Sequence, residues 1–270
     1  MAVPAEASLP EVRLETTPDG RVLLGGAELF SGDGADLLVK LDELVASDSP
    51  QLVVTPNVDH AINLVDQPDY ARVYRNASLR LIDGAPVLWL ARLLGASETR
   101  KFSGSDLIGM CAGAAEGRAW TVVMIGGDVE LCREAEHELR KQYGHDRATF
   151  AAVPVPFLED PADPRATEVV DALTELAPDI VFVCLGSPKQ ELWFEAWQDR
   201  LPAAVFVGAG ATLDFVAGRK QRAPLLFQRL GLEWTWRLLQ EPRRLWKRYL
   251  VKGPRFLPIA VRSWTNREKR

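Results

Sequence analysis

The chain has 270 residues and a net charge of −5, and its hydrophobic (47%) and charged (26%) fractions are those of an ordinary globular protein. No run approaches the roughly 18 consecutive apolar residues of a membrane-spanning helix, and the acidic N-terminal stretch lacks the basic start and apolar run of a secretory signal. The cysteines Cys111, Cys132 and Cys184 are odd in number and widely spaced. We therefore expect a cytosolic protein with reduced, buried thiols.

From the N-terminus, the chain begins with a Pro- and Glu-rich stretch, residues 1–20, which predicts a loose lead-in. Between residues 21 and 218, short β-rich runs alternate with amphipathic helical segments. The expected strands are Arg21–Leu24, Gln51–Val54, Leu79–Ile82, Thr121–Ile125, Thr149–Val153, Ile180–Leu185 and Ala204–Val207, and the expected helices include Asp128–Tyr143, Arg165–Leu176 and Lys189–Asp199. Several strands are continuous hydrophobic runs, as expected when both faces of a sheet are covered. The pattern predicts an α/β body with a Rossmann-like, mostly parallel sheet and helices on both faces.

The composition changes near residue 219. Residues 219–270 hold 15 Lys or Arg and 3 Asp or Glu, so this tail carries +12 and the rest of the chain −17. Four of the eight tryptophans, Trp234, Trp236, Trp246 and Trp264, lie among these cations. We expect one or two helices over Ala223–Val251, with Pro242 at a break or helix start and Gly253–Pro254 as a stop. Cations beside amphipathic rings suit a membrane interface or a phosphorylated lipid, so the tail is predicted to be a basic, helical, membrane-associating appendage.

Glycines and polar side chains follow five of the expected strands. In open parallel sheets, ligands bind beyond the carboxyl ends of the strands, where neighbouring loops converge. The segments concerned are Thr55–Asn57, Asp83–Gly84, Gly126–Asp128, Gly186–Glu191 and Gly208–Gly210. We therefore expect one site at this edge of the sheet.

Each segment also has a purely structural interpretation. Gly126 and Gly127 could let backbone N–H groups approach a phosphate, or could form a tight turn with Asp128 as the helix N-cap. Asp83 could accept a proton from a sugar hydroxyl, or could cap the helix that starts near Pro86.

The LGSPKQE run at 185–191 is more specific. It brings a cation, an amide and a carboxylate to one rim, and the amide of Gln190 can both donate and accept hydrogen bonds, which suits a sugar or uracil edge. The alternative is an exposed, well-capped helix start.

Metal and cofactor chemistry have little support in the sequence. His60, His137 and His145 are scattered, and no Cys/His cluster, Asp-x-Asp pair, Walker-type loop or Gly-x-Ser-x-Gly elbow occurs. The dinucleotide fingerprint is not clearly present, which disfavours a nicotinamide cofactor. We expect neither a metal nor a cofactor.

Seven blocks of the chain, taken together, resemble the bacterial WecG/TagA/CpsF glycosyltransferase family. They are VTPN at 54–57, LRLIDGAPV at 79–87, GSDL at 104–107, LGSPKQE at 185–191, GAGATLDFVAG at 208–218, RAP at 222–224 and LEWTWRLLQEPRRLWKRYL at 232–250. The resemblance spans roughly residues 22 to 252.

This resemblance implies an inverting, metal-independent transferase that moves a sugar from a UDP-sugar to a sugar on a polyprenyl diphosphate lipid. Family members act at the cytoplasmic membrane face in the synthesis of wall teichoic acid, enterobacterial common antigen or exopolysaccharide. The expected donor sugar is an N-acetylhexosamine such as N-acetylmannosamine. The protein is accordingly expected to be peripheral at the inner face of the plasma membrane.

The resemblance also implies roles for residues of this chain. Asp83 matches the proposed general base, with Thr55, Asn57 and Gln190 lining the pocket. The residues expected to border the nucleotide are Gly126, Gly127, Gly186, Lys189, Glu191, Gly208 and Gly210. The cations expected to meet diphosphate are Lys101, Arg222, Arg237, Arg244, Lys247 and Arg248. At position 101 the family usually has an arginine, and lysine is a weaker substitute if that arginine grips phosphate with two hydrogen bonds.

The mechanism expected from these roles is a direct displacement at the anomeric carbon. Asp83 would take the proton from the acceptor hydroxyl, and Lys, Arg and backbone N–H groups would meet the charge of the departing UDP. The appendage would hold the protein at an anionic membrane and complete the site there. Removing the chain after Gly218 is then expected to abolish transfer while the body stays folded.

Other interpretations of the sequence stay open. Within the enzyme class, the donor could be UDP-glucose or a UDP-uronic acid. The chain could instead be a nucleotide-binding domain whose tail binds single-stranded nucleic acid, or a non-catalytic membrane scaffold. We favour a UDP-sugar, a polyprenyl-diphosphate-linked sugar and an anionic membrane as partners, and no nucleic acid. The apolar surface of the tail could also meet a second subunit, so the oligomeric state is not predicted.

Overall fold

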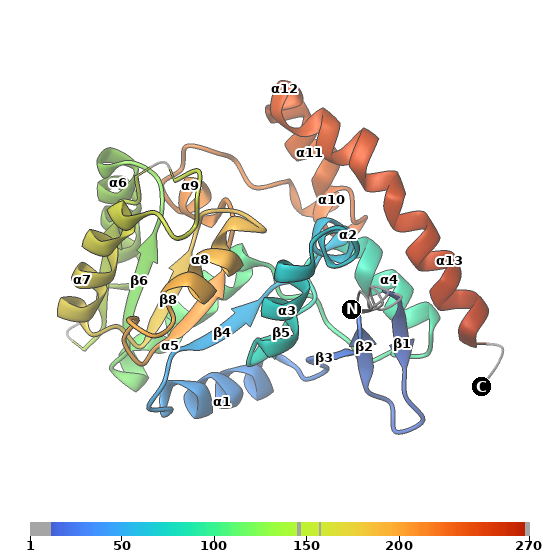
Figure 1. Cartoon of the computed structure of the whole chain (residues 1–270). Coiled ribbons are helices and arrows are strands. Elements are labelled where there is room, and N and C mark those ends of the chain that lie inside the picture. Colours follow the sequence, from blue (N-terminus) through green and yellow to red (C-terminus); the bar gives the residue numbers. More distant parts are fainter. Residues whose placement is uncertain (1–11, 145–146, 157, 268–270) are drawn as a thin grey trace, which may run out of the picture.

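The computed structural model describes residues 12–144, 147–156 and 158–267. Its centre is a six-stranded, wholly parallel sheet with the strand order β5-β4-β9-β8-β6-β7 (Figure 1). The strands are β4 (Gln51–Val54), β5 (Leu79–Arg80), β6 (Thr121–Ile125), β7 (Thr149–Val153), β8 (Ile180–Val183) and β9 (Val205–Gly208). The predicted α/β architecture with a mostly parallel sheet is confirmed.

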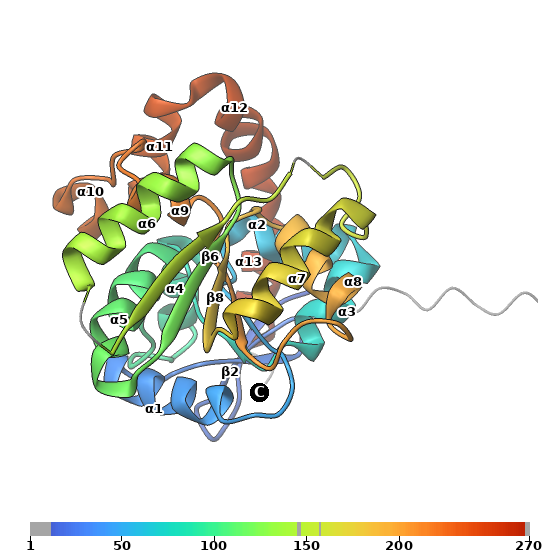
Figure 2. The same cartoon turned by 90° about the vertical axis from the view of Figure 1, so that its left-hand side faces the viewer.

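Helices cover both faces of this sheet (Figure 2). One face carries α1 (Gly34–Val45), α5 (Gly104–Arg118), α6 (Val129–Tyr143) and α9 (Thr212–Val216). The other carries α2 (Val58–Asp66), α3 (Pro68–Asn76), α4 (Ala85–Leu93), the short 3-10 turn η1 (Pro164–Ala166), α7 (Thr167–Leu176) and α8 (Lys189–Trp197). Alternate residues of each strand enter opposite cores: Val123 and Ile125 of β6 lie in one, Val122 and Met124 in the other. Continuous apolar strands are the sequence requirement of this two-sided burial.

The three cysteines lie on the face covered by α5 and α6. Cys111 and Cys132 are buried, Cys184 is partly buried, and all three are free. Burial raises the pKa of the Cys132 thiol to about 11. The thiols are unpaired as expected, and the expected burial holds for Cys111 and Cys132 but only in part for Cys184.

A second, smaller sheet precedes the first and was not predicted. It is antiparallel, in the order β1 (Leu14–Thr16), β2 (Val22–Leu24), β3 (Ala27–Leu29). The predicted lead-in is therefore wrong for Leu14–Thr16, and the expected strand at Arg21–Leu24 belongs to this sheet instead of the parallel one. The turn between β2 and β3 consists of Gly25 and Gly26, whose positive φ angles (60° and 80°) are those of a two-residue hairpin turn. Residues 1–11 lie outside the described chain.

The basic tail forms a series of helices. They are α10 (Leu225–Arg229), α11 (Glu233–Gln240), α12 (Pro242–Trp246), a π-helical turn η2 (Lys247–Lys252), a 3-10 turn η3 (Gly253–Arg255) and α13 (Phe256–Arg267). Pro242 begins a helix, as predicted. The predicted stop at Gly253–Pro254 is wrong, because the chain continues through it into α13. A proline within a helix loses one hydrogen bond and crowds the carbonyl four residues back, and the wider π turn before Pro254 gives room for it.

The last described helix packs against the first described strand. Phe256 and Ile259 of α13 are buried in the core that contains β1 and β2, and the Leu14 backbone N–H donates a 2.8 Å hydrogen bond to Ser263 Oγ. The appendage thus completes a core of the body. Cutting the chain after Gly218 would expose this core, which speaks against the expectation that the truncated body stays folded.

Candidate active site

A crevice opens at the carboxyl edge of the parallel sheet because neighbouring strands send their helices to opposite faces. β4 leads into α2 on one face, whereas the adjacent β9 leads into α9 on the other. The same divergence separates β8, followed by α8, from β6, followed by α6. Such switch points are where open α/β sheets bind ligands.

Asp83 stands where two cavities meet. It lines a small cavity of about 70 Å³ together with the first residues of α5, and a larger one of about 380 Å³ between α2, α4 and the appendage. Glu233 and Arg237 of α11 line both cavities with it. The basic appendage therefore forms part of the wall around Asp83.

The alternative role of Asp83 as a helix cap is not what the structure shows. The N-cap of α4 is Gly84, with φ at +99°, and no side chain caps this helix. Among the described residues, no group donates a hydrogen bond to the Asp83 carboxylate, while its backbone N–H donates to Pro56 O at 2.9 Å. The carboxylate is free to take up a proton.

The surroundings of Asp83 raise its pKa above the usual value. Burial is the main cause, because it disfavours the charged carboxylate. Lys101, His60 and Arg237 act in the opposite direction through their charges, and Glu233 adds to the increase. A carboxylate with a raised pKa is a stronger base, which suits the removal of a proton from a hydroxyl group.

The six predicted diphosphate-binding cations fall into two groups. Arg222, Arg237 and Arg248 line the cavities beside Asp83, and Lys101 acts on the pKa of Asp83 from close by. Arg244 and Lys247 line neither cavity. Arg244 pairs with Glu241 at 2.5 Å, and Lys247 lies over the Trp246 ring at 5.8 Å. The sequence pattern grouped all six because it does not show which side of a helix faces the pocket.

Most of the cations near Asp83 have carboxylate partners. Lys101 forms an ion pair with Glu233, Arg222 with Asp106, and Arg248 with Asp59 at 3.2 Å. The Arg237 guanidinium lies over the Phe215 ring, 5.7 Å from its centre, and forms no ion pair within residues 12–144, 147–156 and 158–267. Arg237 is therefore the cation best placed to receive a substrate anion.

Three predicted pocket residues are buried supports of the crevice. The Thr55 hydroxyl donates to Gly208 O at 2.8 Å. The Gln190 carbonyl accepts from the Gly210 backbone N–H at 3.0 Å, and its amide donates to Glu191 Oε1 at 2.8 Å. Since Thr55, Gln190 and Glu191 are buried and line none of these cavities, they hold the strand-end loops in place. The alternative of an exposed, capped helix start at Lys189–Glu191 is also wrong, because α8 has no side-chain cap.

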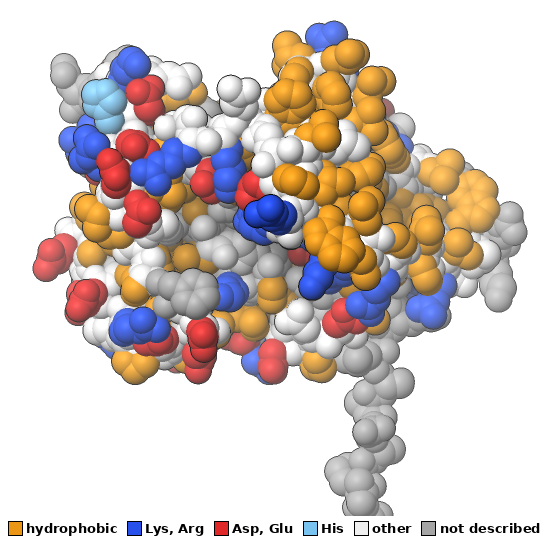
Figure 3. Space-filling view, turned by 90° about the horizontal axis from the view of Figure 1, so that it is seen from above, with side chains coloured by type: hydrophobic (Ala, Val, Ile, Leu, Met, Phe, Trp, Pro, Cys, Tyr) orange, Lys and Arg blue, Asp and Glu red, His pale blue; other side chains and the backbone are white. Residues whose placement is uncertain are grey.

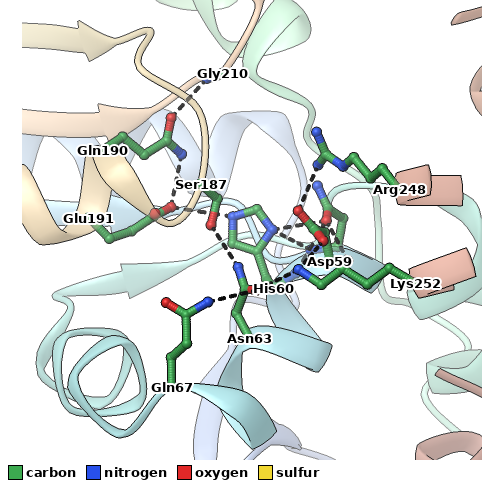
Figure 4. A network of polar contacts seen from close by, with 11 residues as sticks. Asp59, His60, Asn63, Gln67, Ser187, Gln190, Glu191, Gly210, Arg248 and Lys252 are labelled. Carbon is green, nitrogen blue, oxygen red and sulfur yellow. Dashed lines mark hydrogen bonds and ion pairs between the residues drawn. The ribbon is translucent and has the colours of Figure 1, made fainter. Parts of the chain in front are cut away.

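These supports continue into a buried network (Figure 4). His60 Nε2 lies 3.3 Å from Glu191 Oε1, and its Nδ1 lies 2.9 Å from Asn57 Oδ1. Asn57 is the N-cap of α2 and also lines the larger cavity. The network therefore joins the carboxyl ends of β4, β8 and β9.

The appendage is attached to the same helix α2. Asp59 forms ion pairs with Arg248 at 3.2 Å and with Lys252 at 2.6 Å (Figure 4). Lys252 also donates a 2.6 Å hydrogen bond to Asn63 Oδ1. One turn further along, Arg255 forms a bidentate pair with Asp66. The acidic body and the basic tail thus meet through specific ion pairs.

A third cavity, of about 710 Å³, lies beyond the ends of β6, β7 and β8. Gly127, Asp128 and Lys189 line it. Asp128 accepts a hydrogen bond from Leu131 N at 2.8 Å and caps α6, so the tight-turn interpretation of Gly126–Asp128 is confirmed. A Cβ on Gly126 would lie 3.1 Å from Cys184 Cβ, which shows how closely this turn approaches the β8 loop. Gly186 follows β8 with φ at +77°.

Sequence reasoning missed Glu233, His60 and Asp59 as residues of the site. Glu233 lies inside the LEWTWR block, which was interpreted from its tryptophans and its arginine. His60 stands three residues after Asn57, the spacing of a helix-capping pair, which could have placed it beside the pocket.

Among the described residues, no three His, Cys, Asp or Glu side chains lie close enough together to hold a metal ion. His60 faces Glu191, His137 is exposed on α6, and His145 lies outside the described residues. Metal independence stays a prediction.

Residues 22–270 match the family described as Glycosyl transferase WecG/TagA/CpsF. Among curated relatives, a protein of Bacillus spizizenii is 30% identical over 78% of both chains, one of Bacillus subtilis 28% over 80% of this chain and 81% of its own, and one of Staphylococcus aureus 27% over 72% and 73%. All three are named N-acetylglucosaminyldiphosphoundecaprenol N-acetyl-beta-D-mannosaminyltransferase.

The chain belongs to the WecG/TagA/CpsF family of glycosyltransferases. The family match begins at β2 and includes the whole basic appendage. The cavities shared by body and appendage therefore lie within the region that the family has in common.

The appendage of this glycosyltransferase presents a broad apolar surface (Figure 3). Eight of its Leu and Val side chains are more than half exposed: Leu225, Leu226, Leu230, Leu239, Leu250, Val251, Leu257 and Val261. Lys and Arg side chains lie beside this surface in the same view. None of the helices in the described ranges has the length and apolar character needed to cross a bilayer.

Proposed function

We propose that this glycosyltransferase moves an N-acetylhexosamine, with N-acetylmannosamine as the first candidate, from a UDP-sugar to N-acetylglucosamine on a polyprenyl diphosphate. The observation that carries the proposal is the unpaired, basic carboxylate of Asp83 at the junction of two cavities, both of them walled in part by the cationic appendage. The names of the relatives support the donated sugar and the acceptor.

In this proposal, Asp83 removes the proton from the acceptor hydroxyl as that oxygen attacks the anomeric carbon from the side opposite UDP. The bond between the sugar and UDP breaks in the same step, so the configuration inverts. Arg222, Arg237 and the N-terminus of α5 surround the small cavity, where they can meet the negative charge on the leaving group. This arrangement needs no metal.

The two larger cavities suit different parts of the two substrates. The 710 Å³ cavity at β6–β8 is large enough for a nucleoside and combines apolar walls with Asp128 and Lys189. The 380 Å³ cavity is lined largely by apolar side chains, including Trp234, Tyr249 and Leu257, with Arg248 beside them. That combination suits the diphosphate and the first part of a lipid chain.

We further propose that the protein binds an anionic membrane surface through the appendage. The exposed Leu and Val side chains would enter the interfacial layer, and each nearby Lys or Arg would add about 1 kcal/mol of attraction to anionic lipid. The lipid-linked acceptor would then enter the larger cavity from the bilayer. The inner face of the plasma membrane is the compartment where UDP-sugars are expected.

The decisive experiment incubates the protein with a panel of UDP-sugars and a short-chain prenyl-diphosphate-linked N-acetylglucosamine, with product masses and anomeric configuration as the readout. We expect transfer from UDP-N-acetylmannosamine, unchanged by a metal chelator, and a loss of at least 10²-fold in turnover for Asp83→Asn with unchanged UDP affinity. UDP-glucose and a UDP-uronic acid in the panel test the alternative donors. A chain that binds oligonucleotides but transfers no sugar would overturn the proposal.

A further inference from the structure

The pair His60–Glu191 is the most deeply buried ionisable pair of the described chain, and the proposed chemistry does not use it. The Glu191 side chain is 0% exposed and that of His60 4%. One carboxylate oxygen, Oε1, receives the amide of Gln190 and faces His60, while Oε2 has no hydrogen-bond partner among the described residues. Burying a carboxylate that is incompletely hydrogen-bonded is unfavourable by several kcal/mol, so its presence calls for a role.

Contacts at both ends of the Gln190 amide determine its orientation. The Gly210 backbone N–H can only donate, so the carbonyl of Gln190 faces it at 3.0 Å. The NH₂ group of Gln190 then faces Glu191 Oε1, which accepts its hydrogen bond at 2.8 Å. Glu191 thus fixes the turn Gly208–Gly210 through Gln190.

The Gln190 amide packs closely against the turn. A Cβ on Gly208 would lie 2.5 Å from Gln190 Nε2, and Gly210 has φ at +57°. Gln190 is buried and held at both ends of its amide, so it cannot move aside. The turn and the amide therefore keep each other in place.

His60 holds Glu191 from the opposite side. Glu191 Oε1 accepts from Gln190 and lies 3.3 Å from His60 Nε2. The other ring nitrogen, Nδ1, contacts Asn57 at the α2 N-terminus. The result is an unbroken chain of contacts from Asn57, which lines the larger cavity, to the backbone of Gly210 (Figure 4).

We propose that His60 and Glu191 are positioning residues for donor binding. They orient Gln190 and so set the Gly208–Gly210 turn at the mouth of the crevice between β4 and β9. This inference rests on the proposed function, in which the small cavity that Ala209 of this turn lines receives the negative charge of the leaving UDP.

The test uses the full-length chain and two pairs of substitutions. Glu191→Gln removes the acceptor-only carboxylate without changing its shape, and Glu195→Gln is the matched control on the same helix, where Glu195 pairs with Arg72 at the surface. His60→Leu removes the hydrogen bonds of the ring, whereas His60→Gln retains a side-chain donor. The measurements are UDP affinity by calorimetry, steady-state kinetics, melting temperature, and backbone hydrogen exchange over residues 205–214.

If His60 and Glu191 position the turn, Glu191→Gln and His60→Leu should weaken UDP binding and raise the donor KM by about tenfold, with a smaller change in kcat. A tenfold change is the effect of one lost buried hydrogen bond. Hydrogen exchange at the Gly208–Gly210 turn should become faster in both variants. Glu195→Gln should behave like the unmodified chain, and His60→Gln should recover most of the UDP affinity that His60→Leu loses.

The outcomes separate the two proposals. If the unmodified chain binds no UDP, the proposed function fails, although faster exchange at the turn in Glu191→Gln would still support the positioning of the loop. If the unmodified chain binds UDP and the two variants melt at lower temperature but keep its UDP affinity, donor KM and exchange at the turn, the pair is merely structural and the inference is wrong.

Discussion

The carboxylate of Asp83 lies near four ionisable side chains from three parts of the chain. Lys101 precedes α5, His60 is on α2, and Glu233 and Arg237 are on α11. Burial raises the pKa of Asp83, so the folded chain binds this proton more tightly than the unfolded chain does. Ionisation of Asp83 as the pH rises therefore lowers the stability of the fold. The raised pKa of this proposed general base is thus maintained at the expense of stability, as is common at catalytic centres.

Two substitutions beside Asp83 should move its titration in opposite directions. Lys101→Met removes a cation that lowers the pKa of Asp83, so the acidic limb of the profile of kcat/KM against pH should move to higher pH. Glu233→Gln removes an anion that raises this pKa and also frees Lys101, so the limb should move to lower pH. We expect the acidic limb to move by roughly 0.5 to 1 pH unit in each variant.

Lys40→Met on α1 is the control for this pair, because Lys40 pairs with Glu43 at the surface and should leave the profile unchanged. Displacements of the same sign for Lys101→Met and Glu233→Gln would show that Asp83 is not the group that titrates.

The elements around the pocket are joined by ion pairs between α2 and the end of the appendage. Asp59 is only 12% exposed and pairs with two cations of the π-helical turn, Arg248 and Lys252. The π turn has a double function here: it accommodates Pro254, and it directs these two cations to the first turn of α2. The docking of the appendage thereby places Glu233 and Arg237 against Asp83.

Asp59→Asn should loosen this docking, because two partly buried cations lose their counter-charge. We expect a decrease of about 2 kcal/mol in the free energy of unfolding and a reduced kcat/KM for the lipid acceptor, with unchanged UDP affinity. Denaturant unfolding and acceptor kinetics check this. Asp69→Asn on α3 removes an exposed pair with Arg72 and should change stability by less than about 0.5 kcal/mol. Equal effects of the two substitutions would contradict the docking role of Asp59.

The sequence predicts elements whose pattern is local. All six strands of the parallel sheet were located because their apolar runs and flanking glycines are local features, and Asp83 was identified through its place at a strand end. The antiparallel sheet was missed because its strands are three residues long and β1 owes its burial to α13, which lies 249 residues further along the chain. The burial of Gln190 and Glu191, and the ion pairs of Lys101 and Arg222, depend on contacts between distant segments. Side-chain type alone could not distinguish these residues from ligand-binding ones.

The charge asymmetry of the whole molecule has two consequences. Part of the positive charge of the tail is neutralised by the body through Asp59, Asp66, Asp106 and Glu134. Lys and Arg side chains also lie beside the apolar surface in Figure 3. This surface therefore combines the features that favour a membrane interface.

Charged substitutions on this surface should weaken membrane binding without unfolding the chain. For the triple variant Leu239→Glu, Val251→Glu and Val261→Glu, we expect at least a tenfold lower partition onto anionic liposomes, because apolar area is lost from the interface and negative charge is added. The control is a single substitution on α1, Val39→Glu, at a side chain that is 58% exposed. It is compared with the single variant Leu239→Glu. Liposome sedimentation measures both, and an equal loss for Val39→Glu would show that this surface is not the one that meets lipid.

The hydrogen bond from Leu14 to Ser263 places a condition on how the protein is made. A ribosome releases β1 long before α13 has been synthesised, so the small antiparallel sheet must wait with its apolar side uncovered while the parallel sheet forms. Only when α13 arrives can Phe256 and Ile259 close that core. We therefore expect a chain that stops before α13 to leave this core open and to be prone to misfolding during synthesis.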